Sequence, residues 1–546
     1  MWTPGWRDRL WSQCEQPWEL LVIGGGITGA GVLREAAQVG LRVLLVEARD
    51  WAHGASSRSS KLVHGGLRYL RQAQFKLTLE ALRERERLLR EAKGLVNALD
   101  FILACLAGDR TPAWVYAAGL TLYDLLARRW SHRHLAPGEL RAHCPPLAGA
   151  DLRGGFCYFD AETDDARLVL RLISDAVHAG GAALNYARVE RLLRRRDGTV
   201  CGVGLRDEAP ETRGRTVEAL AAVVINATGA WADEVRRLVA GPPRLRPLRG
   251  SHLLFPAARL PLQCAVSFLH PSDGRPVFAV PWEGLTLLGT TDVDHTAGLA
   301  GEPRISRAEQ DYLLEAVAHA FPGMGLGEDD VQATFAGVRP VVDTGQADPS
   351  RESREHVLWE EHGLLTVAGG KLTTFRLMAH QALRAVRARL PGHPRVDPRQ
   401  PLFETPPPDE TFDPRLNPAQ LGRLAGRLGR DIWPLLNEAG SDELEPIGPS
   451  PVLWAELRWA ARAEAVCRLD DLLLRRTRLG LLLPEGGRAC LPRIQAVVQP
   501  ELGWSDERWR QEAEAYQRLW EQAYRREPPS PLRQRGASLE FPQPRK

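Results

Sequence analysis

The chain lacks long hydrophobic runs, paired cysteines and an excess of charge of either sign. No run of eighteen apolar residues occurs, which excludes a membrane-spanning helix. The eight cysteines are scattered without a C-x-x-C pair, so we predict no metal site and expect idle thiols in a reducing compartment. Lys and Arg number 71 against 68 Asp and Glu, a balance that argues against nucleic acid as a partner.

The N-terminal segment also lacks the apolar core of a secretory signal. Residues 1–18 alternate Trp with Arg, Asp and Gln, so we expect the protein to stay in the cytoplasm. This Trp-rich and Arg-rich segment fits two interpretations, an interfacial contact with a membrane or a helix packed on the protein's own surface.

What the sequence does contain is a dinucleotide-binding pattern at residues 19–50. A short apolar strand at 20–23 runs into G-x-G-x-x-G, and a helical pattern and a second buried strand at 41–46 follow. Glu47 stands at the end of that second strand. Strand, glycine turn, helix and acidic residue in this order predict a Rossmann-like nucleotide site. The glycines are Gly24, Gly26 and Gly29.

Each residue of the pattern has a physical task. Gly24 allows a sharp turn, Gly26 lets the backbone approach a pyrophosphate, and Gly29 lets the helix pack close to the sheet. The helix N-terminus attracts the pyrophosphate, and Glu47 can accept hydrogen bonds from a ribose. Leu33 departs from the usual small residue, so we expect it to push the helix outward or to point sideways.

Three other segments are expected to contact the same cofactor. They are a Ser- and Gly-rich loop at 51–70, the turn N-A-T-G-A-W at 226–231, and A-G-G-K-L-T-T at 368–374, which opens a helix. Small residues allow close backbone approach, and hydroxyls and amides can bind phosphate or a ring edge. The predicted cofactor ligands in these segments are Ser57, Ser60, His64, Gly65, Thr228, Gly229, Gly370, Leu372 and Thr373.

The rest of the chain predicts two further domains. Strand patterns at 245–254 and 277–292 indicate a second, antiparallel sheet, and a proline-rich stretch at 391–415 reads as a linker. We therefore predict an α/β fold with three parts and a disordered tail. The boundaries are 18–98, 155–240 and 335–390 for cofactor binding, 99–154 and 241–334 for substrate, 416–526 for a C-terminal helical domain, and 527–546 for the tail.

Motifs along nearly the whole chain resemble the FAD-dependent glycerol-3-phosphate dehydrogenases, whose general fold is shared with amino-acid oxidases. They include G-G-G-I-T-G-A-G at 24, S-S-K-L-V-H-G-G-L-R-Y-L at 59, N-A-T-G-A-W at 226, R-G-S-H at 249, A-G-V-R-P at 336, A-G-G-K-L-T-T-F-R at 368 and L-L-L-R-R-T-R-L-G at 472. The chain departs from the family's pattern at 93–109, on the substrate side.

The resemblance implies an enzyme with FAD as cofactor. It implies oxidation of sn-glycerol 3-phosphate to dihydroxyacetone phosphate by hydride transfer to flavin N5. The electrons would pass to a membrane quinone, with the protein peripheral on the inner face of the cell membrane. The sequence does not decide whether the protein is a homodimer, because the basic face of the C-terminal helices fits a dimer contact, a membrane contact or burial against the cofactor domain.

A phosphate substrate needs cations, and the reaction needs a base. Because the guanidinium fork binds two phosphate oxygens at once, we expect Arg339 and the other basic residues of the family's motifs to bind the phosphate. His252 and His64 both remain candidates for the base, since an imidazole titrates near pH ~6.5. The substrate-binding candidates are Arg68, Tyr69, Arg339, Arg354 and Lys371.

Three alternatives stay open at this point. Oxygen could replace quinone as acceptor, which would make the protein a glycerol-3-phosphate oxidase. An amino-acid-oxidase-like flavoenzyme could act on another small substrate. A flavin-fold protein could serve only as a binding or scaffolding protein, and it would then lack the cation cluster.

Overall fold

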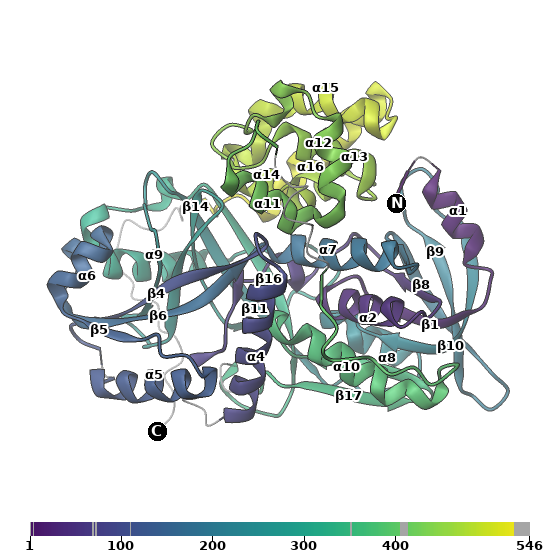
Figure 1. The fold of residues 1–546 in the computed structure, drawn as a ribbon, viewed down its shortest axis with the longest axis horizontal. Coiled ribbons are helices and arrows are strands. Elements are labelled where there is room, and N and C mark those ends of the chain that lie inside the picture. The colour runs from purple at the N-terminus through teal and green to yellow at the C-terminus, as the bar shows by residue number, and fades with distance from the viewer. Residues whose placement is uncertain are drawn as a thin grey trace.

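The computed structural model describes residues 2–3, 5–67, 70, 74–109, 111–349, 352–403 and 413–528. Two sheets lie side by side, and a group of helices from the C-terminal part packs above the junction between them (Figure 1). This matches the predicted α/β fold with a second sheet and a helical domain.

The first sheet carries the glycine turn. Its strand order is β17-β18-β10-β1-β2-β7, and the five strands from β18 to β7 are parallel. Helix α2 (Ile27–Gln38) packs between α7 (Asp165–His178) and α10 (Phe375–Val386) over one face of this sheet. The strands are β1 (Trp18–Ile23), β2 (Val43–Val46), β7 (Ala182–Leu184), β10 (Thr216–Asn226), β17 (His356–Glu361) and β18 (Leu364–Gly369).

A β-hairpin extends this sheet at β10. It consists of β8 (Ala187–Arg194) and β9 (Val200–Asp207), with the left-handed Gly198 in its turn. Leu33 is fully buried on α2, and its Cδ1 lies 3.3 Å from the place where a Cβ on Gly181 would be.

The second sheet is mostly antiparallel, with the order β15-β11-β14-β13-β12-β4-β6-β3. Strand β16 pairs with β11 and β5 pairs with β6. The bounds are β3 (Leu62–Val63), β4 (Val96–Leu106), β5 (Arg133–Leu135), β6 (Leu152–Thr163), β11 (Leu245–Pro256), β12 (Ala265–Leu269), β13 (Pro276–Trp282), β14 (Leu285–Gly289), β15 (Val293–Asp294) and β16 (Ala333–Val342).

Three strands depart from the predicted domain boundaries. All of β3 and most of β6 and β16 were assigned to the cofactor domain, but all three lie in the second sheet. The reason is pairing along the strand, because β6 runs beside β4 from Thr163 to Leu152 and β16 bonds β11 over ten residue pairs. A strand read alone does not indicate which sheet it joins.

The remaining helices cover the second sheet and form the C-terminal part. The first group is α4 (Phe75–Glu91), α5 (Ala113–Ala127), α6 (Pro137–His143) and α9 (Arg307–Ala320), and α8 (Ala232–Arg237) follows β10. The C-terminal helices are α11 (Pro418–Leu428), α12 (Ile432–Glu438), α13 (Trp454–Ala463), α14 (Leu479–Leu482), α15 (Leu491–Leu502) and α16 (Asp506–Ala523), with a π-helical turn at Asp471–Arg476. All but the first residues of the predicted tail lie outside the described residues.

The N-terminal helix α1 (Trp6–Gln13) packs on the protein's own surface. Arg7 is buried in an ion pair with Asp207 at 2.6 Å, and Trp11 is buried beneath Arg215. Of the two interpretations of this segment, the packed helix is therefore the one observed. Among the described residues no helix is both long and apolar enough to cross a membrane.

Candidate functional site

A cavity of about 1120 Å³ is lined by residues from both sheets. Its walls include the ends of the parallel strands β1 and β2, the N-terminus of α2, and one face of α5. Ligands in open α/β sheets bind outside the carboxyl ends of the strands, so this cavity is the candidate functional site.

The glycine turn leaves no room for side chains. A Cβ on Gly24 would lie 2.6 Å from the Ala227 carbonyl oxygen, and one on Gly29 would lie 1.9 Å from the Gly24 carbonyl oxygen. Gly24 also has φ +112°, which favours glycine. Backbone is thereby packed against backbone, and the N-terminus of α2 opens directly into the cavity.

Side chains complete this cradle. The Glu47 carboxylate accepts hydrogen bonds from the backbone N–H groups of Gly25 at 2.7 Å and Arg49 at 2.8 Å, and burial raises its pKa. The Ser56 hydroxyl accepts the N–H of Ile27 at 3.0 Å. An adenine dinucleotide requires a glycine turn and a helix N-terminus for its pyrophosphate and an acidic acceptor for its ribose. All three are present, so the residues fit FAD.

Most of the predicted cofactor residues line this one cavity. Gly29, Ser57 and Gly65 are not among the lining residues, and Gly29 packs against the Gly24 backbone behind the cavity wall. The Ser57 carbonyl accepts Lys61 Nζ at 2.9 Å on the buried side of the loop, and Gly65 N–H donates to Asp160 at 3.1 Å. The residues that do line it are Gly24, Gly26, Glu47, Ser60, His64, Thr228, Gly229, Gly370, Leu372 and Thr373.

Three predicted cations line the same cavity, namely Arg339, Arg354 and Lys371. Arg339 and Arg354 pair with opposite oxygens of the Asp292 carboxylate, at 2.9 Å and 2.7 Å. Arg68 and Tyr69 lie outside the described residues.

Sequence reasoning missed two residues that belong to this group of charges. Asp292 is almost fully buried, and the available signal was its place at the end of the strand pattern predicted at 277–292. Arg275 lines the cavity with its guanidinium 3.7 Å from Asp292. Nothing in its surroundings along the chain distinguishes it from a surface arginine.

His252 lies behind the cavity wall. It is fully buried, stacks on Phe335 with ring centres 4.6 Å apart, and its Nε2 is 2.8 Å from the hydroxyl of the cavity-lining Ser60. Burial, followed by the positive charges of Arg339 and Lys61, holds the pKa of His252 well below its usual value. His252 is therefore neutral at pH 7 and reaches the cavity through one hydroxyl, whereas His64 lines the cavity itself.

The arrangement combines a nucleotide cradle with an anion site and titratable groups. Within the described ranges no cluster of His, Cys, Asp and Glu has the composition of a metal site. The cavity can therefore hold a dinucleotide and, beside it, a small anionic molecule.

Comparison with known proteins agrees with this geometry. Residues 19–376 match the family described as FAD dependent oxidoreductase, and residues 369–509 match the C-terminal domain of alpha-glycerophosphate oxidase. The chain is 36% identical over 530 residues to "Glycerol-3-phosphate dehydrogenase 2" of Mycobacterium bovis, covering 92% of this chain and 88% of the relative.

Two more relatives extend the comparison. "Aerobic glycerol-3-phosphate dehydrogenase" of Bacillus subtilis is 37% identical over 391 residues, 70% of this chain and 69% of its own. The crystal structure of the glycerol-3-phosphate dehydrogenase from Bacillus halodurans complexed with FAD superimposes with a TM-score of 0.77 at 28% identity, over 96% of this chain and 98% of that one.

Proposed function

We propose, from the premise that the chain belongs to the FAD-dependent glycerol-3-phosphate dehydrogenase family, that it oxidises sn-glycerol 3-phosphate to dihydroxyacetone phosphate and passes the electrons to a membrane quinone. FAD is the cofactor, and when bound it accepts the hydride equivalent from the secondary carbon. The chain's own residues hold the phosphate, position the alcohol and take its proton.

The observation that carries the choice of substrate is the cation cluster around Asp292. Three guanidinium groups and one carboxylate leave an excess of two positive charges, and the ammonium group of Lys371 lines the same cavity. That excess suits a phosphate dianion better than the single charge of an amino-acid carboxylate. Amino-acid-oxidase-like activity is the less favoured alternative for this reason.

The proton of the substrate hydroxyl is proposed to move through Ser60 to His252. A neutral imidazole can accept it, and the 2.8 Å contact between Ser60 and His252 supplies the path. A phosphate bound at Arg339 would offset the positive charge that lowers the pKa of His252, so the imidazole becomes a stronger base when substrate is present. His64, which lines the cavity directly, is the competing candidate.

The exposed apolar side chains on α5 and just after it support electron transfer to a quinone at a membrane surface. Trp114, Leu125 and Trp130 are 72%, 63% and 68% exposed, the most of any large apolar side chain in the described part of the chain. Other residues of α5, such as Val115 and Leu122, line the cavity. An apolar helix on the surface beside the active cavity fits insertion at a lipid interface and a short path for a quinone.

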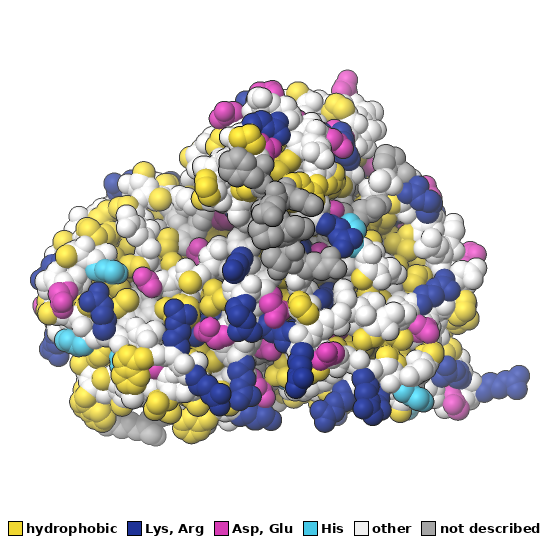
Figure 2. Space-filling view, viewed as in Figure 1, with side chains coloured by type: hydrophobic (Ala, Val, Ile, Leu, Met, Phe, Trp, Pro, Cys, Tyr) yellow, Lys and Arg dark blue, Asp and Glu magenta, His cyan; other side chains and the backbone are white. Residues whose placement is uncertain are grey.

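Charge on the same edge of the molecule fits anionic lipid. Lys76, Arg83 and Arg90 are exposed at intervals of seven residues on α4, and Arg128 and Arg129 follow α5. Hydrophobic side chains gather over α5, and a row of Lys and Arg side chains runs along the lower edge, where α5, α4 and α10 lie (Figures 1 and 2). Each basic residue near such a surface contributes about 1 kcal/mol.

Anaerobic titration tests the reaction. Glycerol 3-phosphate added under nitrogen should bleach the flavin absorbance of the purified protein completely. An unchanged spectrum at excess substrate would refute the proposal, and faster bleaching by non-phosphorylated hydroxy or amino acids would select the alternative substrate class. Arg384→Ala, an exposed arginine on α10, is the control for changes made in the cation cluster.

Vesicle binding tests the acceptor side. The Trp114→Ala/Trp130→Ala double variant should lose most binding to phosphatidylglycerol vesicles and most quinone reduction, while flavin bleaching by substrate stays normal. Leu220→Ala removes another exposed apolar residue and should bind as the parent does. Equal binding by both variants, or rapid turnover with oxygen in solution, would favour the oxidase alternative.

A further inference from the structure

The loop that leaves β2, residues 47–53, has two sides. Glu47, Arg49 and His53 line the cavity, whereas Asp50 points away from it and is fully buried. The loop is bonded to the glycine turn, since Ala52 N–H donates to the Gly25 carbonyl at 2.9 Å. The ring of Trp51 packs so closely on Gly25 that a Cβ there would be 2.7 Å away.

Asp50 is held by the C-terminal part of the chain. Arg476 donates to both Asp50 oxygens at 2.6 and 2.8 Å, and Arg475 donates through Nε at 2.5 Å. Burial alone would raise the pKa of Asp50, but Arg476 and Arg475 hold it well below its usual value. All three side chains are buried, so this is a charged contact without solvent between elements more than 400 residues apart.

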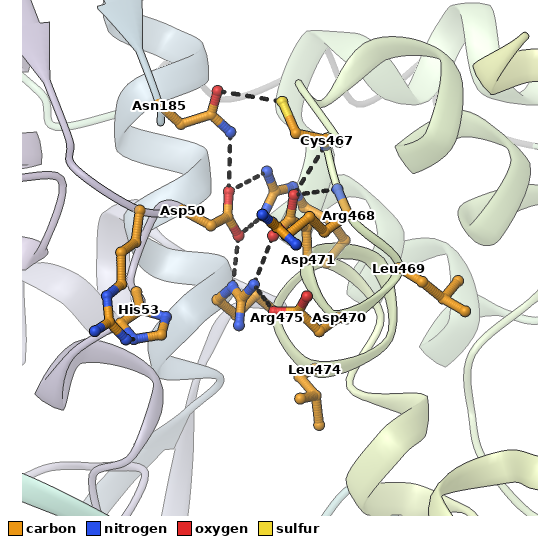
Figure 3. A network of polar contacts seen from close by, with 12 residues as sticks. Asp50, His53, Asn185, Cys467, Arg468, Leu469, Asp470, Asp471, Leu474 and Arg475 are labelled. Carbon is orange, nitrogen blue, oxygen red and sulfur yellow. Dashed lines mark hydrogen bonds and ion pairs between the residues drawn. The ribbon is translucent and has the colours of Figure 1, made fainter. Parts of the chain in front are cut away.

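The two arginines lie on the π-helical turn, where Thr477 N–H donates to the Leu472 carbonyl. Such turns are rare, and they occur frequently at functional sites. Figure 3 shows Arg475 between Asp50 and the carboxylates of Asp470 and Asp471, which lie 2.6 Å from its guanidinium. The arginine is therefore fixed in its own domain before it meets Asp50.

Residues 185 and 186 form a second connection between the same partners. Asn185 donates to Asp50 at 3.1 Å and to the Ala465 carbonyl at 2.9 Å. Tyr186 donates its backbone N–H to the Arg49 carbonyl at 2.7 Å and its hydroxyl to Asp471 at 2.6 Å. The cofactor-facing loop is thus attached to the C-terminal domain both directly and through the chain that follows β7.

We infer that Arg475 and Arg476 of the C-terminal domain are positioning residues for the FAD site, which hold Glu47 and the glycine turn in the binding conformation through Asp50. The C-terminal domain then has a task beyond the reaction proposed above, namely retention of the cofactor. By linkage, FAD binding stabilises the contact between this domain and the loop as strongly as the contact stabilises bound FAD.

The test compares FAD affinity in variants that break an ion pair between the C-terminal domain and either the cofactor loop or the second sheet. Asp50→Asn and Arg476→Gln should raise the dissociation constant of FAD at least tenfold and speed its release, followed by the fluorescence of free flavin. Arg423→Gln breaks an ion pair of the same domain with Glu283, on the second sheet. It should change FAD affinity less than twofold at a comparable loss of thermal stability in the apoprotein.

Two outcomes would overturn the inference. One is FAD affinity within twofold of the parent in both Asp50→Asn and Arg476→Gln, and the other is an equal loss in Arg423→Gln. If the first two variants do not fold, hydrogen exchange of the parent decides. FAD added to the apoprotein should slow exchange in residues 464–478 at least fivefold more than in α15 and α16, and equal protection of both regions would contradict the coupling.

Discussion

The carboxylate of Asp292 lies 2.9 Å from the guanidinium of Arg339, and both residues line the cavity. The ion pair holds an arginine in place before a substrate arrives, so little side-chain freedom is lost on binding. The same arginine also donates to the Thr290 hydroxyl at 2.9 Å. The guanidinium of Arg339 is therefore oriented by two partners, so a substitution of Arg339 is the most direct test of phosphate recognition.

Replacing Arg339 should weaken substrate binding more than it slows turnover. Charge-assisted hydrogen bonds contribute about 1.5–3 kcal/mol each, so Arg339→Ala should raise KM for glycerol 3-phosphate by roughly 10–100-fold. Arg339→Lys should recover part of the loss, because it keeps the charge without the fork. Steady-state kinetics with a dye acceptor measures both, and an unchanged KM in Arg339→Ala would show that the phosphate binds elsewhere.

The pH dependence should distinguish the two histidines. Since the pKa of His252 lies well below its usual value, kcat/KM should stay level from pH 8 down through the usual range of an imidazole. His252→Gln should lower kcat strongly at every pH in that range, with His64→Gln as the comparison. An inflection near pH ~6.5 that disappears only in His64→Gln would assign the base to His64.

Glu162 should make stability depend on alkaline pH. Burial, with Glu283 nearby, raises its pKa to about 8, and among the described residues its Oε2 has no hydrogen-bond partner. Because the pKa of Glu162 is higher in the folded protein, its contribution to stability is fully present below the unfolded pKa of 4.5 and is lost as pH rises through about 8.

Glu162→Gln should therefore match the parent near pH 4 and exceed it at pH 9 by about 2–4 kcal/mol. Denaturant unfolding at the two pH values measures the difference. A variant less stable than the parent at pH 9 would show that the carboxylate is satisfied in its ionised form.

The glycine turn should not tolerate a methyl group at its last glycine. Because a Cβ on Gly29 would lie 1.9 Å from the Gly24 carbonyl oxygen, Gly29→Ala must move α2 away from β1. We expect the purified variant to contain no FAD and to lose about 1–3 kcal/mol in stability. Gly138→Ala, where nothing lies within 4 Å, should keep both, and the ratio of flavin to protein absorbance reports the result.

Local patterns were the easiest part to predict. The strand, glycine turn and helix at 18–38 are encoded by adjacent residues, and they form as expected around Gly24 and Gly29. Strand membership was harder, because β16 has the same alternation whichever sheet it joins. Only its register with β11, from Leu245 opposite Val342 to Leu254 opposite Ala333, places it in the second sheet.

Residues near the site divide in the same way. Ser57, Ser60 and Gly65 belong to one predicted Ser- and Gly-rich loop, yet of these three only Ser60 lines the cavity. The difference follows from contacts far along the chain, since Arg478 donates to the Ser57 carbonyl and Asp160 accepts the N–H of Gly65. No property of the loop by itself distinguishes the three.

The sequence by itself determined the cofactor class and the family, because a turn that only glycine can form and an ordered set of motifs are properties of contiguous residues. The tertiary structure decided which charges meet. Asp292 pairs with Arg339 and Arg354, and Asp50 pairs with Arg475 and Arg476, across 47 to 426 residues of chain. Burial makes such pairs selective, since a charge removed from water is stable only beside an opposite one, and packing alone brings that partner into place.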